Sequence, residues 1–438
     1  MKRMLIPGPL SFRGEISVVG DKSITHRALI LGFLAGNPFC MDNPNPGADC
    51  RRTLDALVCM GLEFCSDGTR WHLVPGGQWR RESHSVYAGN SGTTARLLLG
   101  LAPWLDAGCS LTIDGDQSLR RRPMARVTDL LAAAGVRVEC LDQPGFLPLR
   151  AISLGARPAA HRVAVASAQV KSALLLAGLA AKGLTKVSLP GGSRDHTELM
   201  LEAMGCKLRC DHDVVMIEGS QRLTMPCCYQ VPGDVSAASY WAAGAAVSGN
   251  VRIKSVGLNP GRTVFLDILS RMGAGVSTEN VRWQHGEKVG DVVVQAHLLR
   301  PTEVKAEEVP GCIDELPLVA VVAAHAAGTT VICGAEELRF KETDRLAETL
   351  DMLTAFGVGC WAQGGRIGIE GGQPLHPANY VSDDHRMVMA AAVLAAGAPG
   401  MSNIGDTLWS DVSYPGFEYH FANLAALDYN RITEECDT

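Results

Sequence analysis

Residues 20–32 read GDKSITHRALILG, a polar loop that runs into a helix-like block of small apolar residues. Five further segments repeat this loop-and-helix pattern along the chain. They are GNSGTTARLLLG (89–100), ASAQVKSALLLAGL (166–179), PGDVSAASYWAAG (232–244), GCIDELPLVAVVAA (311–324) and SDDHRMVMAAAVLAAG (382–397). The glycines that follow these blocks recur at a period of roughly 65 to 80 residues, which indicates a fold built from copies of one unit. They are Gly36, Gly108, Gly183, Gly249, Gly328 and Gly400.

A second helix-like segment lies between these blocks and ends in a small or apolar residue followed by glycine. Examples are TLDALVCMG (53–61), VTDLLAAAG (127–135) and LAETLDMLTAFG (346–357). Each is followed by a short β-like run such as VRVEC (136–140), so one copy is predicted to read strand, helix, strand, helix, strand, strand. The sixth copy is incomplete, and the amino-terminal run GEISVV (14–19) is expected to serve as the opening strand of the first copy.

The length of 438 residues argues for two domains, because a single hydrophobic core usually stops growing before this size. Three copies per domain give two domains of about 210 residues each. The chain is expected to cross between them near residues 19–22 and 231–236, where a Gly-Asp step lies just before a helix. The predicted bounds are 1–21 and 236–438 for the domain that contains both termini, and 22–235 for an inserted second domain.

Composition is typical of a soluble globular protein and predicts a cytoplasmic location. Hydrophobic residues make up 47% of the chain and charged residues 20%. No apolar run reaches the ~18 residues that a spanning helix requires, and the first residues lack the apolar core of a signal peptide. The formal net charge of −6 gives no overall attraction to nucleic acid or to acidic membranes. No protein partner is indicated, and a monomer is expected.

The 14 cysteines do not form a metal or redox motif. They are scattered singly apart from Cys227 and Cys228, and no pair of CxxC steps is present. Most lie in apolar segments, where a cysteine behaves as a small hydrophobic residue. The 12 histidines also lack the spacing of metal ligands. No metal site is therefore predicted.

Basic residues recur where the predicted strands turn into helices. They are Lys22, Arg27, Arg96, Arg120 to Arg122, Lys171, Arg194, Lys341, Arg345 and Arg386. A helix start offers free backbone N–H groups and the positive end of its dipole, so several that converge form an anion site. Hydroxyl groups in the same loops, such as those of Ser23, Ser167 and Ser193, are donors of the kind that hold phosphate oxygens. Helix capping with solvated bases would explain one such loop, but the recurrence favours a site for small anions.

Two carboxylates stand among these bases. Asp314 lies at a helix start in CIDELP, and Glu342 lies between Lys341 and Arg345 in FKETDR. A carboxylate among cations has a lowered pKa and one desolvated by a bound substrate has a raised pKa, so both are candidates for proton transfer. The alternative is that each forms a structural ion pair.

Nine segments, taken in order, resemble the signature blocks of the enolpyruvyl transferases. They are GDKSITHRALIL, GNSGTTARLL, GDQSLRRRPM, VASAQVKSALLLAGL, SRDHTE, VPGDVSAASY, IDELPLVAV, FKETDR and DDHRMVMA. The blocks cover the chain from about residue 20 to about residue 427. One block such as KETDR is a weak signal, whereas nine in register are specific. Within the family they are most similar to the branch that acts on shikimate 3-phosphate.

The resemblance implies a fold and a reaction. The fold is a two-domain inside-out α/β barrel built of six βαβαββ repeats, three per domain, with the active site in the cleft between the domains. The reaction transfers the enolpyruvyl group of phosphoenolpyruvate to the 5-hydroxyl of shikimate 3-phosphate and releases phosphate, a step of the shikimate pathway to chorismate and the aromatic amino acids. It uses no metal ion and no organic cofactor. Both substrates carry a phosphate and a carboxylate, which agrees with a set of cationic helix starts.

The resemblance also implies which residues bind each substrate. Those that match the phosphoenolpyruvate site are Lys22, Asn90, Gly92, Thr93, Arg122, Gln169, Lys341, Arg345 and Arg386. Those that match the shikimate 3-phosphate site are Lys22, Ser23, Arg27, Ser167, Ala168, Gln169, Ser193, Arg194, Asp314 and Lys341.

Three of these positions are implied to be catalytic. Asp314 orients the attacking hydroxyl and helps to deprotonate it, and Glu342 protonates the methylene carbon. Lys22 assists proton transfer and the departure of phosphate. His385 either supports Glu342 or has an orienting or capping role. Gly92 leaves room for phosphoenolpyruvate beside its loop.

Three positions depart from part of the family. Val412 stands where some members have a lysine, Glu337 where some have an asparagine, and Ala168 where those members have a second serine. These differences fit the branch of the family that often tolerates glyphosate better.

Three alternative functions stay open at this point. The sister transferase for UDP-N-acetylglucosamine has Lys-Asn in place of Lys22-Ser23 and carries a cysteine in the loop that here reads GDQSLRRRPM (115–124). A paralogous transferase would act on another phosphorylated cyclic alcohol, because few contacts read the ring substituents. A non-catalytic phosphometabolite-binding protein would keep the fold without the chemistry, although the intact Asp314 and Glu342 argue against it.

Overall fold

The computed structural model describes residues 2–76 and 81–435, which form two units with separate hydrophobic cores. The terminal unit consists of Met1–Asp21, Pro232–Trp283 and Lys288–Thr438, and the inserted unit of Lys22–Val231 and Gln284–Glu287. The expected domain bounds assigned residues 232–235 to the inserted domain and residues 284–287 to the other. The chain passes between the units at 21/22, 231/232, 283/284 and 287/288.

The inserted unit contains three four-stranded sheets among its described residues. Their strands, in spatial order, are β14 (Cys228–Gln230), β3 (Phe39–Asp42), β5 (Arg70–Pro75) and β4 (Leu62–Ser66) in the first; β6 (His84–Tyr87), β7 (Ser110–Asp114), β9 (Leu149–Ser153) and β8 (Val136–Cys140) in the second; β10 (Ala160–Arg162), β11 (Leu184–Ser188), β13 (Val214–Glu218) and β12 (Leu208–Asp211) in the third. The helices are α1 (Lys22–Ala35), α2 (Ala48–Cys59), α3 (Gly92–Leu99), η1 (Ala102–Trp104), α4 (Gln117–Arg120), α5 (Ala125–Leu131), α6 (Ala168–Ala180) and α7 (His196–Ala203).

The terminal unit likewise contains three four-stranded sheets in the part of the chain that is described. Their strands are β16 (Gly275–Gln284), β17 (Glu287–Gln295), β15 (Gly249–Gly257) and β2 (Phe12–Ser17) in the first; β18 (Glu303–Val304), β19 (Gly328–Cys333), β21 (Arg366–Gly371) and β20 (Gly359–Gln363) in the second; β22 (Asn379–Val381), β23 (Gly400–Gly405), β1 (Lys2–Gly8) and β24 (Thr433–Glu435) in the third. The helices are α8 (Val235–Val247), α9 (Val264–Arg271), α10 (Val309–Cys312), α11 (Leu316–Ala324), η2 (Glu336–Phe340), α12 (Arg345–Ala355), α13 (His385–Ala395), η3 (Thr407–Val412), α14 (Phe417–Leu424) and α15 (Tyr429–Ile432).

All six sheets share one topology, in which a parallel pair of strands is extended by two antiparallel strands. In the order β6-β7-β9-β8, for example, β6 is parallel to β7, and β9 is antiparallel to both β7 and β8. The parallel pair requires a crossover connection, which the helix α3 supplies. The repeat of strand, helix, strand, helix, strand, strand is therefore the βαβαββ unit that the sequence predicts.

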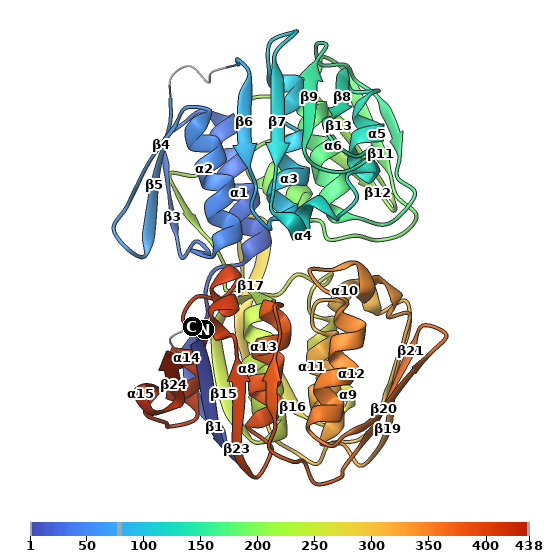
Figure 1. Ribbon diagram of the computed structural model, residues 1–438. Helices are drawn as coiled ribbons and strands as arrows, with labels where there is room; N and C mark the ends of the chain where they lie inside the picture. Colours follow the sequence, from blue (N-terminus) through green and yellow to red (C-terminus); the bar gives the residue numbers. More distant parts are fainter. Residues whose placement is uncertain (1, 77–80, 436–438) are drawn as a thin grey trace. The chain divides into compact units, whose positions relative to one another are not determined.

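The helices at the centre of each unit are buried on nearly every side, as α6 is from Val170 to Leu179 in the inserted unit. In α8, all residues from Val235 to Ala246 are buried, and α11 is buried over its whole length. A helix without a polar face must be enclosed, and the sheets enclose it here (Figure 1). Helices inside and sheets outside give the inside-out α/β barrel, so the predicted fold class is confirmed. None of the described helices is long and apolar enough to cross a membrane.

The expectation that residues 14–19 open the first repeat is wrong. β2 pairs in parallel with β15 and so opens the fourth repeat, whose helix is α8. The first repeat is opened by β14, which pairs in parallel with β3 and places Cys228 opposite Cys40. The reason is that the chain changes unit directly after β2 and directly after β14, so each strand stays in the sheet of the unit that the chain is leaving.

The turn between β16 and β17, residues 284–287, is held by the inserted unit. The ring of His285 stacks on Tyr229 with a centroid distance of 4.6 Å, and His285 Nε2 accepts a hydrogen bond from the backbone N–H of Gln230 at 3.3 Å. Glu287 Oε1 lies 2.6 Å from His196 Nδ1, and both side chains are buried. These contacts tie the turn to β14 and to the start of α7.

Candidate active site

The residues that the sequence singles out lie in two groups, one in each unit, at helix starts or in the loops beside them. In the inserted unit they are Lys22, Ser23 and Arg27 on α1, Asn90, Gly92 and Thr93 at the start of α3, Arg122 after α4, Ser167, Ala168 and Gln169 at the start of α6, and Ser193 and Arg194 before α7. In the terminal unit they are Asp314 before α11, Lys341 and Glu342 after η2, Arg345 at the start of α12, and His385 and Arg386 at the start of α13.

Arg27 is a buried base whose guanidinium is fixed on three sides. Its Nε donates to Thr197 Oγ1 at 2.8 Å, its Nη2 to Ser172 Oγ at 2.9 Å, and its Nη1 to the carbonyl of Ser23 at 2.9 Å. Burial gives each of these hydrogen bonds a low-dielectric surrounding, which strengthens its electrostatic part. The positive charge of Arg27 is thereby held at one place beside α6 and α7.

The loop before α7 presents an unsatisfied hydroxyl. Ser193 Oγ is buried and has no hydrogen-bond partner among the described residues. The loop itself is anchored, because Lys171 Nζ lies 3.4 Å from the carbonyl oxygen of Ser193 and forms a buried ion pair with Glu198. Burial raises the pKa of Glu198 above its ordinary value. A buried donor without a partner in a polar loop is a feature that a bound acceptor such as a phosphate oxygen would satisfy.

Lys22 is held by a carboxylate that no pattern in the sequence pointed to. Its Nζ lies 2.9 Å from Asp49 Oδ2, and only 16% of the Lys22 side chain is exposed. Asp49 belongs to α2, the second helix of the repeat, and lies next to no sequence motif. The charge of Lys22 is therefore paired before any substrate is considered.

A second cluster joins the starts of α3 and α6. Arg96 Nη1 donates to Gln169 Oε1 at 2.8 Å, and Gln169 Nε2 donates to Thr93 Oγ1 at 3.0 Å. Arg122 Nη1 donates to the carbonyl of Asn90 at 3.2 Å, and its Nη2 donates to the Asn90 side chain. The loop of residues 90–93 is thus bracketed by two guanidinium groups.

Gly92 lies between these two guanidinium groups. A Cβ atom at this position would lie 3.0 Å from Arg96 Nη1 and 3.5 Å from Arg122 Nη1. Because 3.0 Å is tighter than an ordinary van der Waals contact, any larger residue would displace the Arg96 side chain. The expectation that Gly92 leaves room for phosphoenolpyruvate stays a prediction.

In the terminal unit, Asp314 is surrounded by cations. Its Oδ1 lies 3.3 Å from Lys341 Nζ and 3.5 Å from Arg345 Nη1, and its Oδ2 lies 3.8 Å from Arg386 Nη2. These three bases come from the loop after η2 and from the starts of α12 and α13. The fold therefore brings together four residues that the sequence predicted to act at one site.

Arg345 connects this cluster to two further carboxylates. Its Nη2 lies 2.5 Å from Glu342 Oε2 and its Nε lies 2.7 Å from Asp384 Oδ2, while its own side chain is 1% exposed. Burial opposes the charge of Arg345, but Asp384 and Glu342 outweigh it and hold the pKa of the guanidinium above its ordinary value. Burial would raise the pKa of Asp384, but the nearby charge of Arg345 keeps that pKa below its ordinary value.

Asp384 has a second role as the N-cap of α13, where it accepts a hydrogen bond from the backbone N–H of Arg386 at 2.8 Å. His385 is buried, and its Nδ1 lies 4.0 Å from Asp384 Oδ1. Asp384 lies in the segment 382–397 but was not predicted from the sequence as a site residue. Its partner Arg345 lies 39 residues away, and no local pattern connects the two.

Arg386 also contacts a buried polar network. Its Nη1 lies 3.8 Å from Glu315 Oε1, and Glu315 also accepts a hydrogen bond from Ser236 Oγ. Arg262 Nη2 donates to the same Ser236 hydroxyl at 2.7 Å. Sequence reasoning missed Glu315 because it is acidic, and it missed Arg262 although this base lies just before α9.

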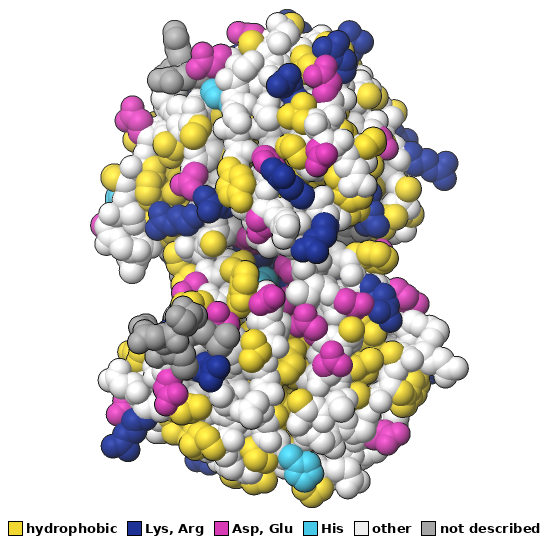
Figure 2. Space-filling model, viewed as in Figure 1, with side chains coloured by type: hydrophobic (Ala, Val, Ile, Leu, Met, Phe, Trp, Pro, Cys, Tyr) yellow, Lys and Arg dark blue, Asp and Glu magenta, His cyan; other side chains and the backbone are white. Residues whose placement is uncertain are grey.

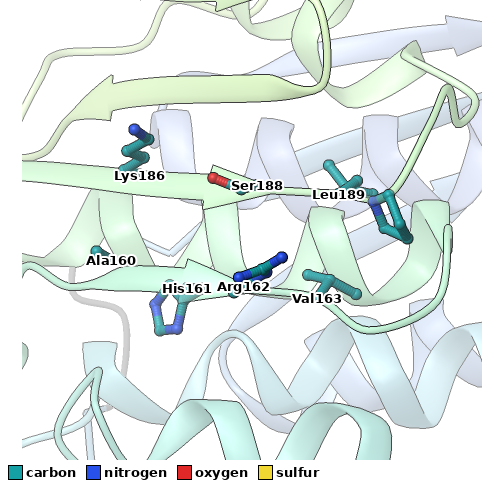
Figure 3. Close-up of a pocket in the computed structure, with 8 residues that line it drawn as sticks. Ala160, His161, Arg162, Val163, Lys186, Ser188 and Leu189 are labelled. Carbon is teal, nitrogen blue, oxygen red and sulfur yellow. The ribbon is translucent and has the colours of Figure 1, made fainter.

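A hollow on the inserted unit lies away from these residues. It follows β10 and β11 and is lined by Ala160, His161, Arg162, Val163, Lys186, Ser188, Leu189 and Pro190 (Figure 3). None of the predicted site residues is among the residues that line it. On the face drawn in Figure 2, acidic and basic side chains are interspersed, and no extended basic surface of the kind that binds nucleic acid is present on that face.

Comparisons with known proteins agree over almost the whole chain. The family model described as EPSP synthase (3-phosphoshikimate 1-carboxyvinyltransferase) matches residues 6–421. A 3-phosphoshikimate 1-carboxyvinyltransferase of Geobacillus kaustophilus is 41% identical over 425 residues, which is 95% of this chain and 98% of the relative. The structure of EPSP synthase from Acinetobacter baumannii superposes with a TM-score of 0.87 at 32% identity and covers 99% of both chains.

A more distant structure shares the fold alone. The enolpyruvyl transferase NikO from Streptomyces tendae superposes with a TM-score of 0.77 at 19% identity and covers 97% of both chains. At this identity the likeness concerns architecture and does not extend to the substrate.

Proposed function

Because this chain belongs to the EPSP synthase family, we propose that the two groups of residues described above are the substrate-binding and catalytic groups of its reaction. That reaction transfers the enolpyruvyl group of phosphoenolpyruvate to the 5-hydroxyl of shikimate 3-phosphate and releases phosphate in the shikimate pathway. The observation that carries the assignment is the position of Asp314 among Lys341, Arg345 and Arg386.

The terminal-unit group suits phosphoenolpyruvate. Arg345 and Arg386 present planar guanidinium groups, which donate two parallel hydrogen bonds to a carboxylate or a phosphate. Lys341 adds a compact charge next to them. In the inserted unit, Lys22, Arg122 and Gln169 would complete the site, with Asn90, Gly92 and Thr93 as the adjoining loop.

The charges of this group are balanced without substrate, and this has a chemical consequence. Lys341, Arg345 and Arg386 already face Asp314, Glu342 and Asp384. An entering phosphate must therefore compete with the carboxylates for guanidinium donors. Glu342, which is more exposed than Asp384, is the carboxylate that we expect the substrate to displace.

Displacement prepares Glu342 for proton transfer. A carboxylate that loses its guanidinium partner and faces an anionic substrate has its pKa raised, so it can carry a proton. Glu342 would then protonate the methylene carbon of phosphoenolpyruvate while Asp314 takes the proton of the attacking hydroxyl. Because the product retains a double bond, one methyl proton must leave again when phosphate departs, with Lys22 assisting that departure.

The inserted-unit group suits shikimate 3-phosphate. The fixed guanidinium of Arg27, the free hydroxyl of Ser193 and the start of α6 offer donors for phosphate and carboxylate oxygens. Ser23, Ser167, Ala168, Gln169 and Arg194 would complete this half, together with Lys22, Asp314 and Lys341. His385 would act as a positioning residue for Asp384 and Glu342.

We also infer how the two groups come to work together. The substrates would bind in a cleft between the units and draw them closed, since each unit carries only part of the set. We propose that the protein acts as a monomer in the cytoplasm and requires neither a metal ion nor an organic cofactor for this reaction.

The test is phosphate release from phosphoenolpyruvate and shikimate 3-phosphate, with each substrate omitted in turn and the product identified by mass. Release that requires both substrates, with the mass of the enolpyruvyl ether, is expected. Release with another phosphorylated cyclic alcohol, and none with shikimate 3-phosphate, would instead identify a paralogous transferase. Binding of both substrates without any release would identify a phosphometabolite-binding protein.

A further inference from the structure

The first sheet of the inserted unit carries cysteines and a histidine in one row across its strands. The strand register places Cys228 on β14 opposite Cys40 on β3, Cys40 opposite His72 on β5, and His72 opposite Cys65 on β4. Residues that face one another across paired strands point to the same side of a sheet. The residues that alternate with this row, such as Met41 and Tyr229, are buried in the core, so the row lies on the outer side.

Two of these thiols meet a carboxylate. Cys228 Sγ lies 3.2 Å from Asp42 Oδ2, and Asp42 is two residues from Cys40 on the same strand. One ligand atom from each of Cys40, Asp42 and Cys228 lies within 4.8 Å of the other two. All three residues are partly exposed, so an ion from solvent can reach them.

The net charge of this group of residues is suited to a divalent cation. Asp42 is paired with Arg70, whose Nη2 lies 3.0 Å from its Oδ2. Two thiolates, one carboxylate and one guanidinium sum to a charge of −2, which a divalent cation would neutralise.

We propose that Cys40, Cys228 and Asp42 form a binding site for a thiophilic divalent transition-metal ion, for which zinc is the natural probe. Two sulfur ligands and one carboxylate oxygen match the donor set of tetrahedral zinc, and solvent supplies the fourth position. Binding replaces two S–H bonds with two bonds from sulfur to the metal and releases two protons to solvent, with no change of oxidation state.

The ion would join the last strand of the inserted unit to its first. β14 is only three residues long, and the chain leaves the unit immediately after it, at 231/232. A bond through the metal fixes β14 to β3 across 188 residues of chain. None of the residues proposed for substrate binding contributes a ligand, so the site is structural and separate from the reaction.

Cobalt titration of the reduced, metal-free protein tests the site directly. Co²⁺ bound by two thiolates in a tetrahedral site gives a sulfur-to-cobalt charge-transfer band and intense visible bands, which zinc abolishes on displacement. We expect one equivalent of Co²⁺ to bind, and an unbuffered titration with zinc to release two protons. The bands should be lost in Cys40→Ser and in Cys228→Ser and retained in Cys227→Ser, the exposed neighbour.

A second readout does not depend on the cobalt spectrum. Zinc should raise the thermal unfolding temperature of the unsubstituted chain and of Cys227→Ser, and should leave that of Asp42→Asn much less changed. Phosphate release should be the same in all metal-free variants that fold, since the ligands lie outside the substrate groups. Failure of the site would thus be distinguishable from failure of the proposed function.

Three results would overturn the proposal. The first is the absence of the charge-transfer band at one equivalent of Co²⁺. The second is a band that persists in both Cys40→Ser and Cys228→Ser. The third is a protein that carries a Cys40–Cys228 disulfide in the cell, shown by a mass two hydrogens below that of the reduced chain and by one linked peptide.

Discussion

Three bases converge on the carboxylate of Asp314, which lies within 3.8 Å of Lys341, Arg345 and Arg386. Such a residue is costly to keep unless its charge is used. A purely structural ion pair would be satisfied by one base. The convergence of three bases on one carboxylate is the residue-level observation that supports the catalytic role proposed for Asp314.

Replacement of Asp314 by Asn should lower turnover by ~10² or more, because the amide keeps the shape but cannot accept the proton of the hydroxyl. The Michaelis constant for phosphoenolpyruvate should change little, since the three bases remain. Steady-state kinetics with both substrates measures this. Asp383→Asn, an exposed neighbour of Asp384, is the control, and wild-type turnover in Asp314→Asn would remove Asp314 from the mechanism.

Glu342→Gln should show the same loss of about 10² in turnover, but for a different reason. The amide can still accept from Arg345 and so preserves the local contact, while it has no proton to give to the methylene carbon. A hydrogen-exchange experiment separates the role of Glu342 from that of Asp314. Incorporation of solvent deuterium into the methylene group of phosphoenolpyruvate should fall with Glu342→Gln, and incorporation at the wild-type rate would contradict the assignment.

Gly92→Ala should raise the Michaelis constant for phosphoenolpyruvate by about tenfold, because the new methyl group displaces the Arg96 guanidinium by a fraction of an ångström. The constant for shikimate 3-phosphate should move less. Gly192→Ala is a useful control, since no atom lies within 4 Å of a Cβ at that position. Equal effects of Gly92→Ala on both constants would place Gly92 outside the phosphoenolpyruvate group.

At the scale of the elements, the starts of α12 and α13 depend on one ion pair. Asp384 caps α13 and pairs with Arg345, the first residue of α12, and both side chains are buried. Asp384→Asn should lower the free energy of unfolding at neutral pH by about 3 kcal/mol, because it leaves a buried guanidinium without its fully buried carboxylate partner. Urea denaturation measures the change, with Asp383→Asn as the matched control.

The difference in unfolding free energy between the unsubstituted chain and Asp384→Asn should depend on pH in a defined direction. The pKa of Asp384 is lower in the folded protein than its ordinary value of 3.8. The stability that its charge contributes is therefore present above about pH 4 and is lost as the pH falls through the lower folded value. The gap between the unsubstituted chain and Asp384→Asn should narrow in acid, and a gap that widens below pH 4 would contradict the ion pair.

The turn between β16 and β17 is the second element whose role can be tested. Glu287→Ala removes the partner of His196 in a buried place and should cost about 1–3 kcal/mol of unfolding free energy. Glu279→Ala removes an exposed carboxylate from the same hairpin, where it pairs with Arg252, and should cost less than about 1 kcal/mol. Equal losses for the two variants would show that the contact between Glu287 and His196 does not hold the turn in place.

At the scale of the whole molecule, the two units have separate cores and divide the predicted residues between them. We therefore expect the radius of gyration to fall when both substrates bind together, since catalysis requires the two groups to meet. Small-angle scattering of the protein alone, with each substrate and with both, measures this. Unchanged dimensions with both substrates would count against closure.

The sequence by itself determined the repeat of strands and helices and most of the basic residues at helix starts, whereas the inside-out barrel was implied by the family resemblance. These properties depend on residues that lie close together in the sequence. An apolar block after a polar loop predicts a buried helix, and the periodic recurrence of this pattern predicts six copies. Family resemblance added the substrates and the roles of Asp314 and Glu342. None of this required knowledge of which strand pairs with which.

Only the tertiary structure determined which residues and which strands pair with one another. Asp49 reaches Lys22 and Asp384 reaches Arg345 through folding, and no local pattern marks either pair. The sequences of β2 and β14 do not show which sheet each strand joins. That depends on where the chain crosses between the units, which pairs β2 with β15 and β14 with β3. Cys40, Asp42 and Cys228 meet for the same reason. Strand pairing joins residues far apart in sequence, and its register depends on the packing of the whole sheet.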